Sequence, residues 1–136
     1  MERSSGAAPP PQSGGRGHDK TLSVHVEDSP DGGTIVVLSG ELDLSTVPRM
    51  ERPLLEQVQQ RPAVLVDLSG LNFIDSSGIG ALIQAKRIAN GTPVSFLVAT
   101  GSQVDRVFGI ARIAEALPLF SDRQAAMAAL ASALDD

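Results

Sequence analysis

A pair of serines lies where an apolar segment gives way to a helical pattern. Residues 75–80 read Asp-Ser-Ser-Gly-Ile-Gly, after the apolar run at 64–66 and before a second apolar segment with helical spacing. This order predicts a strand, a loop and then a helix that begins near the serines. Free backbone N–H groups and the positive end of the helix dipole collect at such a start, so the fold would tolerate a phosphate on Ser76 or Ser77. We therefore interpret the chain as a small regulatory module built around this segment.

The residues around the serine pair do not favour catalysis. A nucleophilic serine needs a general base, but His18 lies near the N-terminus, His25 lies within a predicted strand, and no Gly-x-Ser-x-Gly motif is present. The chain has no cysteine and no pair of histidines at ligand spacing, which argues against a metal site. The glycines that follow the serines resemble a phosphate-binding turn only weakly, because the P-loop lysine is absent. We expect a protein that is not an enzyme, with no catalytic residue, metal or cofactor.

The same segment also allows a purely structural interpretation. Asp75 or Ser76 could be no more than the N-cap of a helix, with Gly78 and Gly80 permitting close packing. Glu41 and Asp43 stand on a predicted loop, where two carboxylates are usually just solvated. The residues by themselves leave this alternative open.

Composition narrows the class of protein. The chain has 136 residues, 42% of them hydrophobic, which suits one domain with a real core. The net charge is −5 with scattered Lys and Arg, and there is no Tyr or Trp on which bases could stack, so we expect neither nucleic acid nor an anionic membrane as a partner. No apolar run approaches the roughly 20 residues of a membrane helix, and no signal-peptide pattern is visible, so the expected location is the cytoplasm.

The N-terminal segment differs from the rest of the chain. Residues 1–20 are rich in Pro and Gly and include a run of prolines. Such a composition cannot bury enough apolar area to offset the entropy lost on ordering. We expect a disordered tail at 1–20 and one folded domain at 21–136.

Beyond this tail, the hydrophobic pattern alternates between strands and helices. Two strands around a cluster of turn residues predict an antiparallel hairpin, and later strands separated by helices predict parallel neighbours. Strands are expected at 22–26, 35–38, 63–68, 94–98 and 117–120, and helices at 46–60, at 76–89, from 102 to an end or weak point at Gly109, and at 123–134. The expected fold class is α/β, a mixed β-sheet with helices packed against it.

Two details concern the first predicted helix. The segment 40–43 is expected to leave the preceding strand, and Ser45 or Thr46 is the expected N-cap of the helix. Pro53 then falls inside that helix, where a proline costs about 3 kcal/mol or more. We therefore expect a kink at this proline, or a break with a new start near Arg52.

Four segments occur in the order and spacing of the STAS domain family. They are Gly40-Glu41-Leu42-Asp43, the apolar strand at 63–68, Asp75-Ser76-Ser77-Gly78-Ile79-Gly80 and Val107-Phe108-Gly109-Ile110. Within the family, the chain most resembles the stand-alone bacterial anti-sigma factor antagonists, from about Leu22 to Leu134. The family fold that this resemblance implies agrees with the mixed sheet expected above.

The resemblance implies a phosphorylation switch. In these antagonists the serine after the aspartate, which corresponds to Ser76, accepts phosphate from an anti-sigma factor that is a serine kinase of the GHKL ATPase class, and a PP2C-type phosphatase removes it. The unphosphorylated form binds the anti-sigma factor and releases the sigma factor. Phosphorylation adds about −1.5 to −2 charge among carboxylates and switches binding off. The implied partner-binding residues are Glu41, Asp43, Asp75, Ser76, Ser77 and Gly78.

Other interpretations share the same fold. The chain could be a STAS module of another class, from a stressosome, a lipid-transport system or a membrane transporter, without a phosphoserine switch. It could also be a constitutive binder in which Ser76 is never phosphorylated. We expect a monomer or a weak dimer.

Overall fold

The computed structural model describes residues 21–29, 33–111 and 116–135. The expected tail at 1–20 and the tip of the predicted hairpin turn at 30–32 lie outside the described residues. In chain order the elements are β1 (Leu22–Asp28), β2 (Thr34–Leu42), α1 (Val47–Gln60), β3 (Val64–Ile74), α2 (Ser76–Ala89), β4 (Val94–Leu97), α3 (Gln103–Ala111), β5 (Leu119–Phe120) and α4 (Arg123–Asp135). This is the predicted order of strands and helices.

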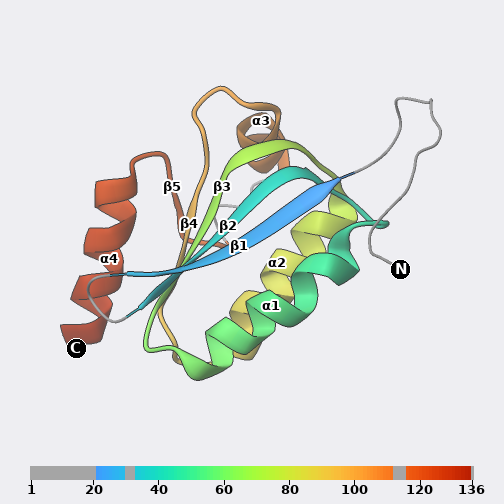
Figure 1. Cartoon of the computed structure of the whole chain (residues 1–136). Helices are drawn as coiled ribbons and strands as arrows, with labels where there is room; N and C mark the ends of the chain where they lie inside the picture. The colour runs from blue at the N-terminus through green and yellow to red at the C-terminus, as the bar shows by residue number, and fades with distance from the viewer. Residues whose placement is uncertain (1–20, 30–32, 112–115, 136) are drawn as a thin grey trace.

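The strands form one five-stranded sheet in the order β1-β2-β3-β4-β5 (Figure 1). β1 pairs antiparallel with β2 as the predicted hairpin, whereas β2, β3, β4 and β5 are parallel neighbours. The predicted α/β class and mixed sheet are therefore confirmed. Because β2 and β3 are parallel, their carboxyl ends meet at one edge of the sheet. β1 begins at that same edge, with Leu22 opposite Gly40.

Helices cover both faces of the sheet (Figure 1). α1, α2 and α3 lie on one face, where their apolar side chains form the larger core with the strands. α4 lies on the opposite face, over β3 and β4. The largest fully buried side chains of the first core include Leu38, Leu42, Met50, Leu54, Ile74, Leu82, Phe96 and Phe108. The second core consists of Ile35, Ala63, Leu65, Leu97, Ala126 and Leu130.

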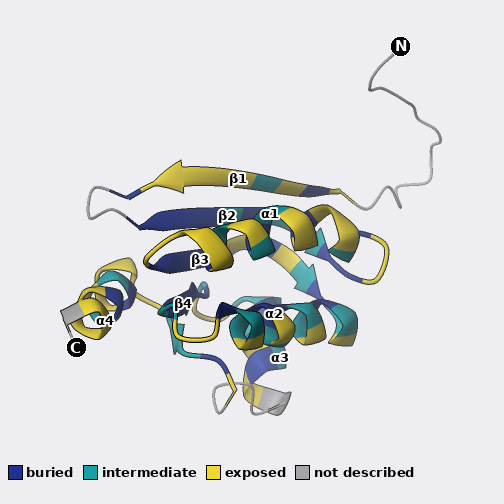
Figure 2. Ribbon diagram, turned by 90° about the horizontal axis from the view of Figure 1, so that it is seen from below, coloured by how far each residue is buried: buried dark blue, intermediate teal, exposed yellow. Residues whose placement is uncertain are grey.

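Burial rises from the outer strand β1 toward the central strands of the sheet (Figure 2). Leu22 is the buried residue of β1, and the remaining residues of that strand are half-buried or exposed. The first five residues of β3, from Val64 to Leu68, are all buried. This pattern confirms the central strand, covered on both faces, that the apolar run predicted.

β2 and β3 are longer than the sequence predicted. β2 continues to Leu42 and β3 to Ile74, so both predicted strand ends are wrong and no loop separates β3 from Asp75. The two extensions pair with each other in parallel, with two register irregularities. Gly70 permits this pairing, because a Cβ there would lie 2.7 Å from the hydroxyl oxygen of Ser39. Backbone pairing thus overrides the low strand propensity of serine and glycine.

α1 runs without a break from Val47 to Gln60 although Pro53 lies inside it. The predicted break with a new start near Arg52 is therefore wrong. The buried side chains of the helix are Met50, Leu54 and Val58. Burying one such side chain stabilises by about 1.5–3 kcal/mol, so three together outweigh the roughly 3 kcal/mol that an interior proline costs.

α3 likewise continues past the residue expected to end it. The helix includes Gly109 and extends to Ala111, so an end at the glycine, one of the two expected outcomes, is wrong. Val104 and Phe108 point into the larger core and are 0% and 2% exposed. Their burial stabilises the helix up to the glycine.

Candidate functional site

The carboxyl ends of β2 and β3 bring the two predicted motifs together. Leu42 pairs with Ile74 across the two strands. The backbone N–H of Asp75 donates to the carbonyl of Leu42 at 3.2 Å. Residues 41–45 and 75–80 therefore form one continuous surface, which we call the β2–α2 surface.

Asp43 organises the loop between β2 and α1. It is 3% exposed, and its Oδ1 accepts hydrogen bonds from the N–H of Ser45 at 3.0 Å, the hydroxyl of Ser45 at 2.8 Å and the N–H of Thr46 at 3.2 Å. The hydroxyl of Thr46 accepts from the N–H of Asp43 at 3.0 Å and donates to the carbonyl of Glu41 at 2.8 Å. Asp43 is thus a buried loop-forming residue, and the expectation of a solvated carboxylate is wrong for it.

Asp75 is the N-cap of α2. Its backbone is extended, with φ −117° and ψ −174°, and its Oδ1 accepts from the N–H of Gly78 at 3.0 Å. Of the two residues considered as N-cap, the aspartate has this role, and Ser76 is the first residue of the helix. Ser76 is exposed, whereas Ser77 is half-buried. The cap therefore leaves the Ser76 hydroxyl accessible at the start of the helix.

The two glycines of the motif have different surroundings. Gly78 is buried, and a Cβ there would lie 2.7 Å from the carbonyl oxygen of Leu42 and 2.8 Å from Cγ1 of Ile74. Only a residue without a side chain allows α2 to approach the strand ends this closely. A Cβ at Gly80 would meet no atom within 4 Å among the described residues. The expected role of the glycines in close packing within the domain is therefore confirmed for Gly78 and wrong for Gly80.

A shallow hollow of about 420 Å³ opens between the loop and the start of α2. Its lining residues are Asp43, Leu44, Ser45 and Asp75. Leu44 is 75% exposed, the most exposed large hydrophobic side chain in the described part of the chain. Sequence reasoning missed this residue, because one leucine between polar residues carries no signal of its exposure.

α3 supports the end of β3. The side chain of Gln103 accepts from the N–H of Ile74 at 3.1 Å and donates to the carbonyl of Ile74 at 3.5 Å. β4 pairs with β3 only as far as Asp67. Beyond that point, the side-chain amide of Gln103 makes hydrogen bonds to the β3 backbone that a neighbouring strand would otherwise make. Sequence reasoning missed Gln103, because it acts through backbone groups of a distant segment. Thr46, by contrast, is the N-cap residue of α1, one of the two residues expected there.

All six predicted partner-binding residues lie at this edge of the sheet, but they differ in accessibility. Ser76 is exposed, Glu41, Asp75 and Ser77 are half-buried, and Asp43 and Gly78 are buried. The first four can therefore meet a partner directly. The two buried residues can act only by holding the others in position.

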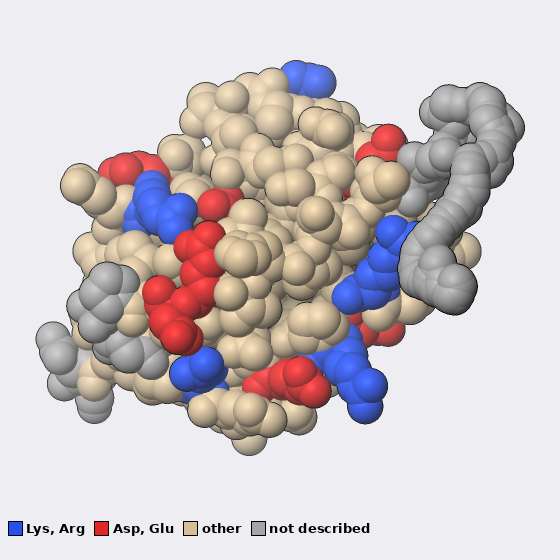
Figure 3. All heavy atoms as spheres, in the orientation of Figure 1, with Lys and Arg blue, Asp and Glu red and all other residues tan. Residues whose placement is uncertain are grey.

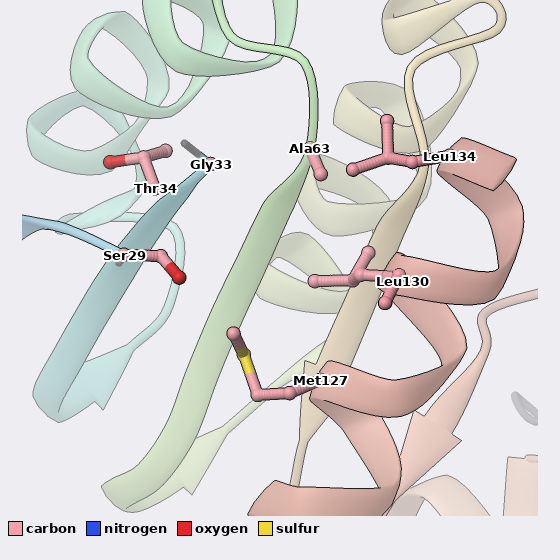
Figure 4. A pocket seen from close by; sticks show the side chains of 8 residues that line it. Ser29, Gly33, Thr34, Ala63, Met127, Leu130 and Leu134 are labelled. Carbon is pink, nitrogen blue, oxygen red and sulfur yellow. The ribbon is translucent and has the colours of Figure 1, made fainter. Parts of the chain in front are cut away.

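A second cavity lies at the opposite end of the sheet. It has a volume of about 210 Å³ and opens between α4 and the amino ends of β2 and β3 (Figure 4). Met127, Leu130 and Leu134 line it from α4, facing Ala63 and Thr34. The Thr34 hydroxyl already donates to a backbone carbonyl at 2.8 Å. This cavity is mainly apolar and does not adjoin the β2–α2 surface.

Three further features of the described residues bear on other kinds of function. Within the described ranges, no group of three or more acidic or histidine side chains is placed to hold a metal ion. In the same part of the chain, no helix is long and apolar enough to cross a membrane. Acidic and basic side chains are interspersed on the face shown in Figure 3, with uncharged areas between them. That face carries no continuous basic patch.

Comparison with known proteins identifies the family. The family model of the STAS domain matches residues 23–126. The chain belongs to the STAS domain family. This STAS domain is 31% identical over 103 residues to the anti-sigma-F factor antagonist RsfB of Mycobacterium tuberculosis, a match that covers 74% of this chain and 83% of the relative. It is 25% identical over 113 residues to the anti-sigma F factor antagonist of Paenibacillus polymyxa, covering 80% of this chain and 97% of that relative.

Solved structures agree with this assignment. The anti-sigma factor antagonist from Mycobacterium paratuberculosis superposes with a TM-score of 0.73 at 26% identity, over 82% of this chain and 95% of that one. The antagonist SpoIIAA in its unphosphorylated form gives a TM-score of 0.60 at 20% identity, over 76% and 92% of the two chains, and this likeness shows the fold alone. The predicted membership among the anti-sigma factor antagonists of the STAS family is therefore confirmed. These relatives are named as regulators, not as enzymes.

Proposed function

We propose that this STAS domain is an anti-sigma factor antagonist that phosphorylation of Ser76 switches off. Unmodified, its β2–α2 surface binds an anti-sigma factor and so releases a sigma factor. The family and the similarity to named antagonists support the antagonist role. The observation that carries the switch is the position of Ser76, exposed as the first residue of α2 and directly after the N-cap Asp75.

A phosphate at Ser76 is compatible with the fold. Negative groups at a helix N-terminus stabilise the helix by about 0.3–1 kcal/mol. The cap bond from Gly78 to Asp75 does not involve the serine hydroxyl, so the modification leaves it in place. The phosphorylated domain should therefore remain folded.

Binding, in contrast, responds to the phosphate. The group adds about −1.5 to −2 charge beside the carboxylate of Asp75 and at the same sheet edge as Glu41. A partner that covers this surface would have to desolvate a dianion among carboxylates, which is unfavourable. A penalty of about 3 kcal/mol would raise the Kd more than about a hundredfold.

The switch needs two enzymes as partners. An anti-sigma factor that is a serine kinase of the GHKL ATPase class would bind the domain and phosphorylate it. The Ser76 hydroxyl oxygen would attack the terminal phosphorus of ATP, ADP would leave, and the hydroxyl proton would pass to a base on the kinase. A PP2C-type phosphatase would hydrolyse the phosphoserine. SpoIIAA, which shares this fold, has been solved in both unphosphorylated and phosphorylated forms, which supports a modifiable state of the fold.

A kinase assay with the cognate anti-sigma factor and ATP, read by intact mass and peptide mapping, tests the site. We expect one phosphate on Ser76 in the wild type and in the matched control Ser77→Ala, and none in Ser76→Ala. Phosphate on Ser77 would refute the assignment. Wild type that binds the anti-sigma factor but is never modified would identify a constitutive binder.

Titration calorimetry on two variants tests the consequence for binding. Ser76→Ala should bind the anti-sigma factor as tightly as the wild type does. Ser76→Glu should stay folded, as circular dichroism can show, and should bind about a hundredfold more weakly. Tight binding by Ser76→Glu would argue against the charge mechanism.

A further inference from the structure

We propose that Leu44 is the apolar anchor of this interface, and that it inserts into an apolar pocket of the anti-sigma factor kinase beside the kinase's nucleotide site. The proposal rests on the proposed function and names how the partner is held. Three features of the β2–α2 surface carry it. They are the exposure of Leu44, the hydrogen-bonded loop that presents it, and the open space at Gly80.

The loop that contains Leu44 reverses the usual distribution of polar and apolar side chains. Leu44 is 75% exposed, whereas Asp43 and Thr46 in the same loop are 3% and 1% exposed. Apolar side chains normally gain from burial, and acidic ones are almost never fully buried. An apolar side chain that gains little from its own fold, on a loop that buries Asp43 and Thr46, indicates a role outside the domain.

Hydrogen bonds fix the position of this side chain. Oδ1 of Asp43 accepts from two groups of Ser45 and one of Thr46, at 2.8–3.2 Å. The hydroxyl of Thr46 also ties the loop back to the carbonyl of Glu41 at 2.8 Å. Leu44 is therefore presented on a loop that has little conformational freedom left to lose, and such pre-organisation raises affinity.

Gly80 gives an independent indication of close approach by a partner. It lies one helical turn after Ser76, and both residues are exposed on α2. Glycine in a helix interior is less stable than alanine. Because a Cβ at Gly80 would meet no described atom within 4 Å, the domain itself does not require a glycine there. A partner surface that comes against the backbone of α2 would require one.

The position of Leu44 relative to Ser76 determines which partner fits. Leu44 and Asp75 line the same hollow, and Ser76 is the next residue in the chain. A kinase that brings the terminal phosphate of its nucleotide to the Ser76 hydroxyl therefore also covers Leu44. The apolar pocket that receives Leu44 accordingly belongs to that kinase and lies next to its nucleotide site.

Binding of the anti-sigma factor kinase to the full chain, measured by titration calorimetry, tests the anchor. Leu44→Ala should raise the Kd at least about tenfold with an unchanged Tm, because the side chain makes little contact with its own domain. Leu134→Ala is the matched control, since Leu134 is also exposed, at 44%, but lies on α4 across the sheet. Its Kd should equal that of the wild type.

Two glycine-to-alanine variants test whether the partner comes close to the backbone of α2. Gly80→Ala should raise the Tm and weaken binding about tenfold. Gly109→Ala, where an added Cβ also meets no described atom within 4 Å, should raise the Tm without changing the Kd. A wild type that does not bind would overturn the proposed function itself. A wild type that binds, with Leu44→Ala binding equally well or with both glycine variants equally weakened, would overturn the anchor alone.

Discussion

Alanine substitution at either of the two glycines of α2 adds a single methyl group. The two substitutions distinguish a glycine needed for packing within the domain from one that only a docking partner would need. Alanine at Gly78 would place its Cβ 2.7 Å from the carbonyl oxygen of Leu42 and 2.8 Å from Cγ1 of Ile74. That carbonyl already accepts the N–H of Asp75 at 3.2 Å, so it cannot shift without disturbing the end of the strand. Alanine at Gly80 meets no such obstacle.

The expected effects have opposite signs. Overpacking costs about 1–3 kcal/mol, and replacing a helical glycine by alanine returns up to about 1 kcal/mol. Gly78→Ala should therefore destabilise by up to about 2 kcal/mol, whereas Gly80→Ala should stabilise by up to about 1 kcal/mol. At about 4 °C per kcal/mol for a domain of this size, the Tm should fall by up to about 8 °C in the first variant and rise by up to about 4 °C in the second.

Differential scanning calorimetry of the wild type and both variants, at one protein concentration, measures these shifts. Gly109→Ala provides a third reference, because its added methyl group also meets no described atom within 4 Å. If Gly78→Ala proves as stable as Gly80→Ala, then α2 does not lie against the end of β2 as closely as the structure places it. That result would refute the packing role assigned to Gly78.

Two further predictions concern carboxylates and are measured by urea unfolding. Asp75→Ala should cost about 1 kcal/mol because the cap bond from Gly78 is lost, whereas Asp75→Ser should keep most of the stability; equal losses would contradict the capping role. Asp67→Ala should cost about 1–3 kcal/mol, because this carboxylate, 7% exposed, accepts from the N–H and hydroxyl of Ser69 at 2.9 Å and 2.5 Å. Arg123→Ala should cost less than about 1 kcal/mol, since the arginine is 46% exposed and lies 3.5 Å from Asp67; a larger loss than for Asp67→Ala would show that the ion pair dominates.

The order of elements was predictable because each strand and helix carries its own apolar period. The buried run from Val64 to Leu68 is the clearest case, since a central strand needs apolar residues on both faces. The strand ends were not predictable in the same way. Ser39 and Gly70 have little strand propensity, and the pairing that recruits them exists only once β2 and β3 lie side by side. The break expected at Pro53 was wrong for the same reason, because the burial that offsets the cost of this proline comes from tertiary packing.

The candidate site could be located from the sequence, but which of its residues are buried and structural and which are exposed could not. The residue types at 75–78 were enough to predict a helix start that presents a serine. They could not show that Asp43 is buried, because its burial depends on bonds that Ser45 and Thr46 make only when the loop closes. The exposure of Leu44 follows from the same closure, so no local pattern reports it.

The proposed change of charge at Ser76 is compatible with the fold, because the neighbours of this serine perform the structural tasks at the start of α2. Asp75 satisfies the free N–H of Gly78, and the missing side chain of Gly78 lets the helix approach β2. If the serine itself were the cap, a phosphate would remove the hydroxyl that holds the helix start, and modification would change the fold as well as the surface. With the cap on the preceding aspartate, modification changes the surface charge alone. This separation is what a switch in binding requires, and it is the physical reason for assigning the switch to Ser76 over the half-buried Ser77.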